Sequence, residues 1–256
     1  MRLSRPTIPR MSRPGIQLLA TCLIDGLFPE VGESVIAVLA RAGVDVTFPP
    51  DQTCCGQPAF NAGFWEEARR MARHTIKVFT ASPDPVVIPS GSCAHMIRHG
   101  YLELFADDPA WLARARLLAE RTSELTEFLV DRLGRANLGA AASRRVAYHP
   151  SCHLLRGLGV DRQPQVLLEA VTGLEVHRLE AECCGFGGVF SIDEADLSAE
   201  MLKRKLAAIE AADVSAVVGC DVSCLMQIEG GLRKQGSPVR CMHLAQLLAE
   251  REPGLR

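Results

Sequence analysis

Aromatic residues are scarce in this sequence, and neither sign of charge dominates it. Phe, Trp and Tyr make up 5% of the 256 residues, so Leu, Val and Ala must do most of the packing in a core. The formal net charge is −2 at pH 7, whereas a nucleic-acid-binding protein usually carries a basic excess. No window holds the roughly 18 consecutive apolar residues that a membrane-spanning helix needs. The hydrophobic share of 48% is nevertheless large enough for a substantial core.

Several signatures of export and catalysis are also missing. The first segment, MRLSRPTIPRMSRPG, is basic, broken by proline and without the apolar stretch of a secretory signal, so we expect residues 1–15 to form a disordered lead-in. The glycine-rich stretch GFGGVF departs from a dinucleotide-binding fingerprint, because Phe190 stands where the last glycine belongs. We find no P-loop, flavin signature or Ser–His–Asp order, and nothing that suggests hydride removal from a substrate by this chain alone.

Cysteine, by contrast, is abundant, with ten residues in the chain. Without an export signal we expect a cytoplasmic, reducing compartment, where structural disulfides are rare. Abundant cysteines in such a compartment indicate metal binding or redox chemistry. The structural alternative is a set of inert buried thiols, since free cysteine packs as a small hydrophobic residue.

The cysteines recur along the chain at a nearly constant offset. Four pairs are separated by 129 to 131 residues: Cys22 and Cys152, Cys54 and Cys183, Cys55 and Cys184, and Cys93 and Cys224. The flanking residues repeat as well, since AGVDVTF before the first vicinal pair matches TGLEVHRL before the second. A period of half the chain predicts a duplicated domain. We expect a first repeat over 16–132, a linker over 133–145 and a second repeat over 146–256.

Patterns of strand and helix alternate in both halves. In the first half, IQLLAT, VDVTF and PVVIPS predict strands, and FWEEARRMARHTIKVFTA has the apolar spacing of a helix. RVAYHP, LEVHRL and SAVVGC repeat the strands in the second half. The alternation predicts an α/β fold made of two pseudo-symmetric βα repeats with Rossmann-like parallel sheets. The paired cysteines follow the expected strands, and ligands gather at the carboxyl ends of strands in such sheets.

Four thiols would therefore converge in each repeat. The first set is Cys22, Cys54, Cys55 and Cys93, and the second set is Cys152, Cys183, Cys184 and Cys224. Four soft thiolates select zinc or an iron–sulfur cluster. Structural zinc sites usually use cysteines about two to four residues apart, which neither set contains. Adjacent cysteines suit a wider, polynuclear centre, so the spacing favours iron–sulfur; a zinc-stabilised scaffold is the alternative.

Other residues near the cysteines are secondary candidates. Gly56 and Gly185 follow the vicinal pairs and can adopt positive φ, which would bring the backbone close to a bound centre. Histidine can ligate iron, donate a hydrogen bond to cluster sulfur or move a proton. Four histidines lie beside the cysteines: His95, His99, His149 and His153. Ser92 and Ser223 either donate to cluster sulfur or cap the following helix.

The motifs taken together resemble a known family. The pattern C-x31-CCG…SC-x-x-M, repeated as C-x30-CCG…SC-x-x-Q, is similar to the cysteine-rich CCG domain. That domain occurs in the B subunit of heterodisulfide reductase and in the iron–sulfur subunits of glycolate and glycerol-3-phosphate dehydrogenases. Five segments narrow the resemblance to stand-alone CCG proteins of three-component lactate utilization systems: CCGQPAFNAGFWEEAR, PSGSCAHMIRHGY, YHPSCHLLRGLGV, ECCGFGGVFSI and DVSCLMQIEGGL. The resemblance covers about residues 16 to 250.

This resemblance implies an electron-transfer subunit rather than a complete enzyme. It would pass on electrons released when L-lactate becomes pyruvate, beside a second iron–sulfur protein and a smaller third component. The eight paired cysteines would hold one or two clusters of the [4Fe-4S] type. The expected location is cytoplasmic, with attachment to the inner face of the membrane through partners. A subunit of a glycolate-type dehydrogenase and a thiol–disulfide reductase are the alternatives within the family.

The sequence departs from the reductase pattern at one place. In heterodisulfide reductase the last motif ends in C-x-x-C, whereas Met96 and Gln227 stand at those positions here. A four-cysteine centre in each repeat is therefore the simpler expectation. His153 and Cys220 are the weaker candidates for an additional iron ligand. We expect Cys220 to be a buried thiol at a strand end, and Cys241, at the start of the last helix, to be structural too.

Overall fold

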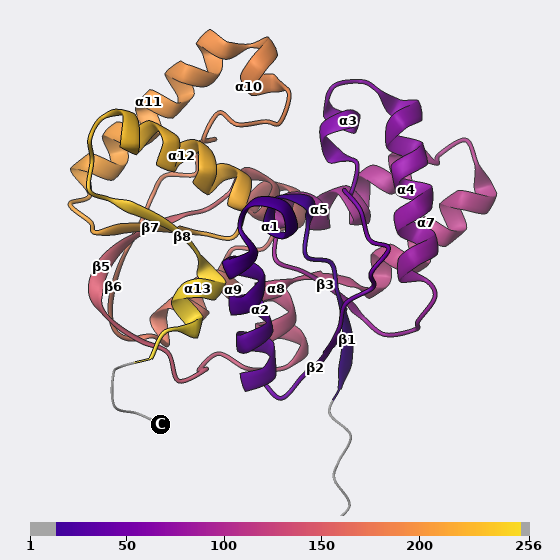
Figure 1. The fold of residues 1–256 in the computed structure, drawn as a ribbon, viewed down its shortest axis with the longest axis horizontal. Helices are drawn as coiled ribbons and strands as arrows, with labels where there is room; N and C mark the ends of the chain where they lie inside the picture. The colour runs from indigo at the N-terminus through magenta and orange to yellow at the C-terminus, as the bar shows by residue number, and fades with distance from the viewer. Residues whose placement is uncertain (1–13, 252–256) are drawn as a thin grey trace, which may run out of the picture.

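The structure, a computed structural model, describes residues 14–251 and consists of two four-stranded parallel sheets (Figure 1). The first sheet has the order β2-β1-β3-β4 and the second the order β6-β5-β7-β8. The strands are β1 (Gly15–Leu18), β2 (Asp45–Thr47), β3 (Val86–Ile88), β4 (Thr122–Glu124), β5 (Ala141–His149), β6 (Thr172–Arg178), β7 (Ala216–Gly219) and β8 (Arg240–His243). The two sheets have the same topology, which confirms the expected α/β fold with a repeated βα unit.

Helices connect the strands in both halves. The first half contains α1 (Cys22–Leu27), α2 (Pro29–Arg41), α3 (Gln57–Asn61), α4 (Trp65–Phe79), α5 (Gly91–His95), α6 (Tyr101–Leu104), α7 (Pro109–Arg121) and α8 (Leu125–Glu127). The second contains α9 (Arg162–Glu169), α10 (Phe190–Asp193), α11 (Ala195–Ala211), α12 (Val222–Lys234) and α13 (Leu244–Ala249). Three π-helical turns cover Met96–Gly100, Phe128–Arg132 and His153–Gly157. No helix within residues 14–251 is long and apolar enough to cross a membrane.

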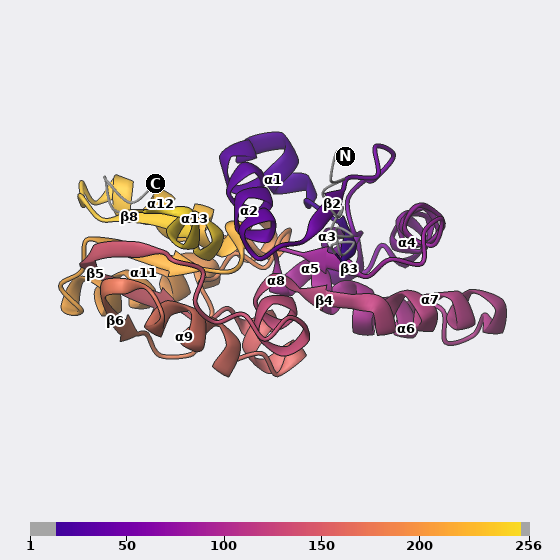
Figure 2. The same cartoon turned by 90° about the horizontal axis from the view of Figure 1, so that it is seen from below.

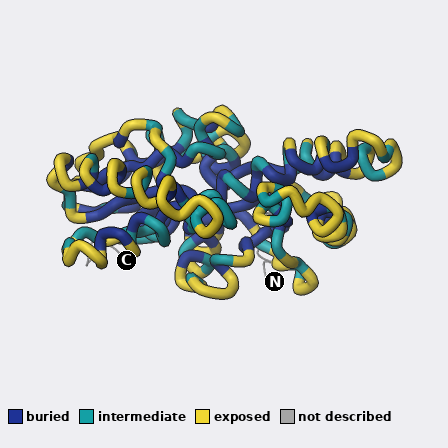
Figure 3. The backbone as a smooth tube through the Cα atoms, turned by 90° about the horizontal axis from the view of Figure 1, so that it is seen from above, coloured by how far each residue is buried: buried dark blue, intermediate teal, exposed yellow. Residues whose placement is uncertain are grey.

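The inner strands are apolar on both sides, which places packed layers on both faces of each sheet. Val87 of β3 packs into a layer between the two sheets, while its neighbours Val86 and Ile88 face the outer side. In β5, Tyr148 enters the same central layer and Ala147 faces outward. The central layer thus contains side chains from both repeats. The inner strands β3 and β7 are wholly buried, whereas the edge strands β2 and β6 are mostly exposed. Figure 3 shows buried chain in the interior and exposed chain on the outward sides of the flanking helices.

Helices of both repeats meet between the sheets. α2 packs against α13 in the middle of the molecule, whereas α4 and α7 lie at one side and α11 and α12 at the other (Figure 2). The Arg41 guanidinium at the end of α2 donates to the carbonyl oxygens of Leu248 at 2.8 Å and Ala249 at 2.9 Å. It also donates to the carbonyl of Leu138 at 3.2 Å. One side chain therefore satisfies the last carbonyls of a helix from the other repeat.

Some boundaries differ from those expected. Residues 1–13 of the expected lead-in (1–15) lie outside the described residues. β1 begins at Gly15, which is inside the expected lead-in. β5 begins at Ala141, inside the expected linker, because Ala141, Arg144 and Arg145 already pair with β6. Cys241 lies within β8 and not at the start of a helix. α7 and β4 are additional elements that the sequence patterns do not predict.

Candidate metal centre

The paired cysteines all lie at the carboxyl ends of neighbouring strands. In the first repeat, Cys22 opens α1 after β1, the vicinal pair follows β2, and Cys93 lies in α5 after β3. The strand order β2-β1-β3 makes these three strands neighbours, so the three segments meet at one edge of the sheet. β6, β5 and β7 repeat the arrangement for the second set, which ends with Cys224 in α12.

The four thiols of the first set line one cavity of about 280 Å³. The Cys55 thiol donates to Cys93 Sγ at 3.3 Å, and the Gly56 backbone N–H lies 3.5 Å from Cys54 Sγ. Cys55 and Cys93 are buried, whereas Cys22 is exposed at the rim. The prediction that distant segments bring four sulfur atoms to one place is therefore met in this repeat.

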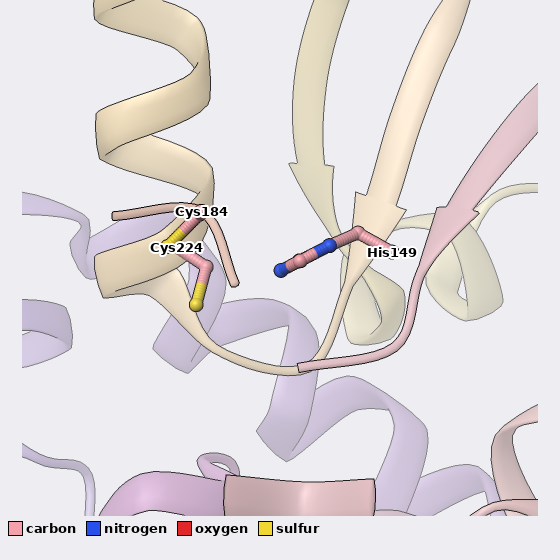
Figure 4. Close-up of side chains that lie close together, drawn as sticks. All are labelled: His149, Cys184 and Cys224. Carbon is pink, nitrogen blue, oxygen red and sulfur yellow. The ribbon is translucent and has the colours of Figure 1, made fainter. Parts of the chain in front are cut away.

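The four thiols of the second set line a matching cavity of about 260 Å³. The Gly185 N–H lies 3.4 Å from Cys183 Sγ, as its counterpart does in the first repeat. One ring nitrogen of His149 and the sulfur atoms of Cys184 and Cys224 all lie within 4.8 Å of one another. All three residues are buried, and the His149 ring points toward the two sulfur atoms (Figure 4).

The two cavities share a wall. Gln57 and Phe186, each two positions after a vicinal cysteine pair, line both cavities. Ser92 and Ser223, each one position before a paired cysteine, also line both. Equivalent residues of the two repeats thus separate the sites, and groups bound in the cavities would be close neighbours.

The glycines after the vicinal pairs have the backbone conformation expected of them. Gly56 has φ 87° and Gly185 has φ 89°, values that side chains other than glycine rarely tolerate. A Cβ atom at Gly185 would also lie 2.5 Å from the Ser198 carbonyl oxygen. In each turn the glycine's own N–H faces the sulfur of the cysteine two positions earlier, and the positive φ at that residue favours glycine.

Thr21, just before Cys22, has an unusual backbone conformation for a β-branched residue. Its φ is 72°, and the residue is buried. Its hydroxyl accepts the Ile24 N–H at 3.4 Å and so caps α1. Such a conformation costs on the order of 1–3 kcal/mol and persists only where the surroundings impose it. Thr21 and Cys22 both line the first cavity, and no sequence pattern signals this conformation.

Within each set the thiols are hydrogen-bonded to one another. Hydrogen bonds from Cys22 and Cys55 lower the pKa of the Cys54 thiol to about 3. Hydrogen bonds from Cys152 and Cys184 likewise lower the pKa of Cys183 to about 2. The donor Cys22 has a raised pKa, because its thiol donates a hydrogen bond to the Cys54 thiolate. In each set, hydrogen bonds from neighbouring thiols therefore stabilise one thiolate. A bound soft metal centre would stabilise the thiolates through its positive charge instead.

An aspartate of the second repeat caps a helix of the first. Asp221 Oδ1 accepts the Ser90 hydroxyl at 2.7 Å and the Ser92 N–H at 3.0 Å, while its other oxygen accepts the Ser151 hydroxyl. Ser90 is the N-cap of α5, and its Oγ accepts the Cys93 N–H at 3.3 Å. The capping role considered for Ser92 and Ser223 is therefore wrong, because Ser90 and Asp221 occupy the N-cap positions.

The weaker ligand candidates lie in different surroundings. His153 lines the second cavity, with Nδ1 3.9 Å from Cys152 Sγ and Nε2 3.5 Å from the amide nitrogen of Gln57. Cys220 lines neither cavity and packs in the central layer, where burial raises the pKa of its thiol. Burial also raises the pKa of Cys241 to about 12 beside the outer layer of the second repeat. These positions fit a structural role for Cys220 and Cys241.

Known proteins are similar to this chain in sequence. A family model described as "Cysteine-rich domain" (CCG) matches the chain twice, over residues 16–98 and 146–229. "Lactate utilization protein A 2" of Bacillus cereus (strain Q1) is 43% identical over 237 residues, which cover 92% of this chain and 98% of that protein. "Lactate utilization protein A" of an Exiguobacterium species is 45% identical over 240 residues, with 93% and 98% covered.

A solved structure supports the fold alone. The crystal structure of a hypothetical protein from Helicobacter pylori superposes with a TM-score of 0.63 at 10% sequence identity. The match covers 95% of this chain and 49% of that one, so our chain spans about half of its length. Both halves match the cysteine-rich model, and the relatives are matched over nearly their whole length. This chain therefore belongs to the CCG cysteine-rich domain family that includes the lactate utilization protein A relatives.

Proposed function

We propose that this chain is an iron–sulfur electron-transfer subunit of a multicomponent system that oxidises L-lactate to pyruvate. The observation that carries the proposal is the pair of adjoining cavities, each lined by four cysteines from three neighbouring strand ends. The names of the relatives supply the link to lactate. The partners are a second iron–sulfur protein and a smaller third component, and we place the assembly in the cytoplasm, attached to the membrane only through partners.

The donor atoms around both cavities fit an iron–sulfur cluster. The first cavity is lined by four thiols, hydroxyl groups, the Gln57 amide and apolar side chains, with no carboxylate among its lining residues. The second cavity adds the Asp221 carboxylate, which accepts hydrogen bonds from Ser90, Ser92 and Ser151. Four thiolates per site match the number of irons in a [4Fe-4S] cluster, and soft sulfur donors favour iron–sulfur over harder metals. When bound, such a cluster would supply one-electron redox chemistry. We propose that the eight paired cysteines are the ligands of two clusters.

The surrounding residues would shield and tune the site. Ile24 and Val222 are buried together beside the first cavity, with Leu23 packed against them, so apolar side chains limit water access there. The N–H groups of Gly56 and Gly185 point at thiolate sulfur and stabilise its negative charge. Cys22 at the exposed rim gives the first cavity an edge close to solvent. This is the side on which we expect a redox partner to approach.

Metal analysis of anaerobically purified protein tests the proposal. We expect iron and acid-labile sulfide in roughly equal amounts, and an electron paramagnetic resonance signal after reduction. Zinc without sulfide would reject the electron-transfer function and favour the scaffold alternative. Disulfide reduction by the purified chain would favour the reductase alternative. Reconstitution with both partners and L-lactate should reduce the clusters. Reduction by glycolate but not by L-lactate would favour a glycolate-type system.

Cysteine variants test the ligand assignment. We expect Cys55→Ser to remove iron from the first site and Cys184→Ser from the second, each leaving the other site filled. Cys241→Ser is the matched control, because this cysteine lies outside both cavities and should leave the iron content unchanged. Full iron retention in the Cys55 and Cys184 variants would refute the assignment.

A further inference from the structure

A buried histidine beside the second cavity faces two of its sulfur atoms. His149 ends β5 and is 1% exposed, and neither ring nitrogen makes a well-formed hydrogen bond with a described residue. The ring lies beside the Cys224 thiol, whose pKa is lowered most by a hydrogen bond from Cys184 and further by His149. Buried polar groups are nearly always hydrogen-bonded, so we expect the ring to donate to the sulfur atoms that it faces. The ring points toward Cys184 and Cys224, and the ligand atoms of all three residues lie within 4.8 Å of one another (Figure 4).

The first repeat has no such histidine. His149 stands three positions before Cys152, and the equivalent position, three before Cys22, is Leu19. Leu19 is fully buried in the outer apolar layer of its repeat. The two sites match in their four cysteines and in the glycine N–H groups that face sulfur, but differ at this position.

We propose that the His149 ring donates an N–H hydrogen bond to sulfur at the second centre and thereby makes this centre easier to reduce than the first. The inference rests on the proposed function, because it assumes an iron–sulfur cluster in each cavity. Reduction adds negative charge to a cluster and its thiolates, and a hydrogen-bond donor stabilises that charge, which raises the reduction potential. Leu19 offers no donor, so the first centre lacks this stabilisation.

A donor role fits better than ligation of iron by His149. The second cavity already has four thiols, the same number as the first. The first repeat completes its set with Leu19 in place of histidine, so the histidine is additional to the ligands. His149 is therefore a positioning and tuning residue. A single electron shared by the two centres would reside on the second and leave the first oxidised. The hydrogen-bonding proton stays on the His149 ring throughout.

Asp221 is a second difference between the sites. Its carboxylate lines the second cavity, whereas the equivalent Ser90 lines the first. The carboxylate accepts hydrogen bonds from Ser90, Ser92 and Ser151.

His153 is another difference between the sites. Its equivalent in the first repeat is Leu23. It is only half-buried, and Nδ1 lies 3.9 Å from Cys152 Sγ. Because solvent also reaches this ring, we expect His153→Leu to shift the potential of the second centre less than His149→Leu does. It is a matched control for the loss of a histidine near the same cluster.

Potentiometric titrations followed by electron paramagnetic resonance test the inference on the full chain. Cys184→Ser and Cys55→Ser isolate the first and the second centre, respectively. We expect the second centre to have the more positive midpoint potential. His149→Leu should lower that midpoint by about 59 mV, which corresponds to a tenfold change in a one-electron reduction equilibrium. The midpoint of the first centre should not change. His149→Gln keeps an N–H donor and should restore part of the shift.

The outcomes separate this inference from the proposed function. Two clusters with a second midpoint that is unaffected by His149→Leu would overturn the inference and leave the function intact. Loss of iron from the second centre alone in that variant would make His149 a ligand, which also overturns it. Wild-type protein without iron and sulfide would instead reject the proposed function.

A measurement on the unsubstituted chain covers the case in which His149→Leu does not fold. Electron–nuclear double resonance on protein containing ¹⁵N-histidine should detect a weak nitrogen coupling to the reduced second centre, lost in folded His149→Gln protein. A strong coupling typical of an iron–nitrogen bond, or no coupling at all, would overturn the inference.

Discussion

The Ser90 hydroxyl donates a 2.7 Å hydrogen bond to Asp221, 131 positions further along the chain. Cys93 and Cys224 are separated by the same number of positions, so Ser90 and Asp221 are equivalent residues of the two repeats. Equivalent residues can touch only close to the axis that relates the repeats. This hydrogen bond therefore marks the centre of the molecule, beside the wall that separates the two cavities.

Asp221→Ala should destabilise the whole molecule. The substitution leaves the buried Ser90 hydroxyl and the Ser92 N–H without their acceptor, and each unsatisfied group costs about 1–3 kcal/mol. We expect the free energy of unfolding to fall by about 2–4 kcal/mol in urea denaturation. Asp107→Ala is the control, because Asp107 is exposed and should change stability by less than about 0.5 kcal/mol. Equal stability of the two variants would contradict a structural role for the bridge.

Gly185→Ala should damage the second site specifically. The substitution introduces a side chain at φ 89° and places its Cβ 2.5 Å from a backbone oxygen. Gly43→Ala is the matched control, since Gly43 has φ 83° but no atom within 4 Å of the added Cβ. We expect the control to lose about 1–2 kcal/mol from backbone strain alone. Gly185→Ala should lose more free energy of unfolding, measured by denaturation, and should bind less iron at the second site, measured by iron analysis. Similar losses of stability in both variants would argue against the close contact.

Glu124 should make stability depend on pH. Burial raises the pKa of its carboxyl group to about 8, and the nearby Asp221 acts in the same direction. The folded protein then holds a proton that the unfolded chain has released above its own pKa of 4.5. Stability should therefore fall as pH rises from about 4.5 to about 8, by up to about 1.4 kcal/mol per pH unit.

Glu124→Gln should remove this dependence, because the amide stays neutral throughout the window. Thermal or urea unfolding at several pH values between 5 and 8 measures the slope for the wild type and the variant. Exposed Glu120→Gln is the control and should keep the wild-type slope. An unchanged slope in Glu124→Gln would assign the dependence to other groups.

Cys220→Ala should separate a structural thiol from the proposed ligands. Cys220 is buried in the central layer and lines neither cavity, so iron content should stay at the wild-type value. Loss of its packing should lower the free energy of unfolding by about 1 kcal/mol. Cys224→Ala, four positions later in the chain, should lose iron from the second site. Iron loss in Cys220→Ala would instead identify this residue as a ligand.

Much of the fold follows from local patterns in the sequence. The apolar spacing of FWEEARRMARHTIKVFTA predicts a helix over residues 64–81, and α4 covers Trp65–Phe79. The apolar run PVVIPS predicts the strand that appears as β3. Alternating strands and helices have few alternatives to a parallel sheet, and its carboxyl edge determines where the cysteines gather. The convergence of each set could be predicted for this reason.

Other features depend on how distant parts of the chain pack. β4 consists of Thr122, Ser123 and Glu124, which have no apolar pattern and become a buried strand only by pairing with β3. The bridge from Asp221 depends on the placement of one repeat against the other, which no local pattern encodes. The difference between His149 and Leu19 is visible once the repeats are aligned. Only the structure shows that the buried His149 ring faces the sulfur atoms of Cys184 and Cys224.

The central layer also has an evolutionary consequence. Because side chains of both repeats form it, a single repeat would expose an apolar face that only a second copy could cover. The ancestor of this chain would then have been an obligate homodimer, with the same residue at every equivalent position. In a single chain that constraint is absent, so one site can carry a histidine where its equivalent carries a leucine.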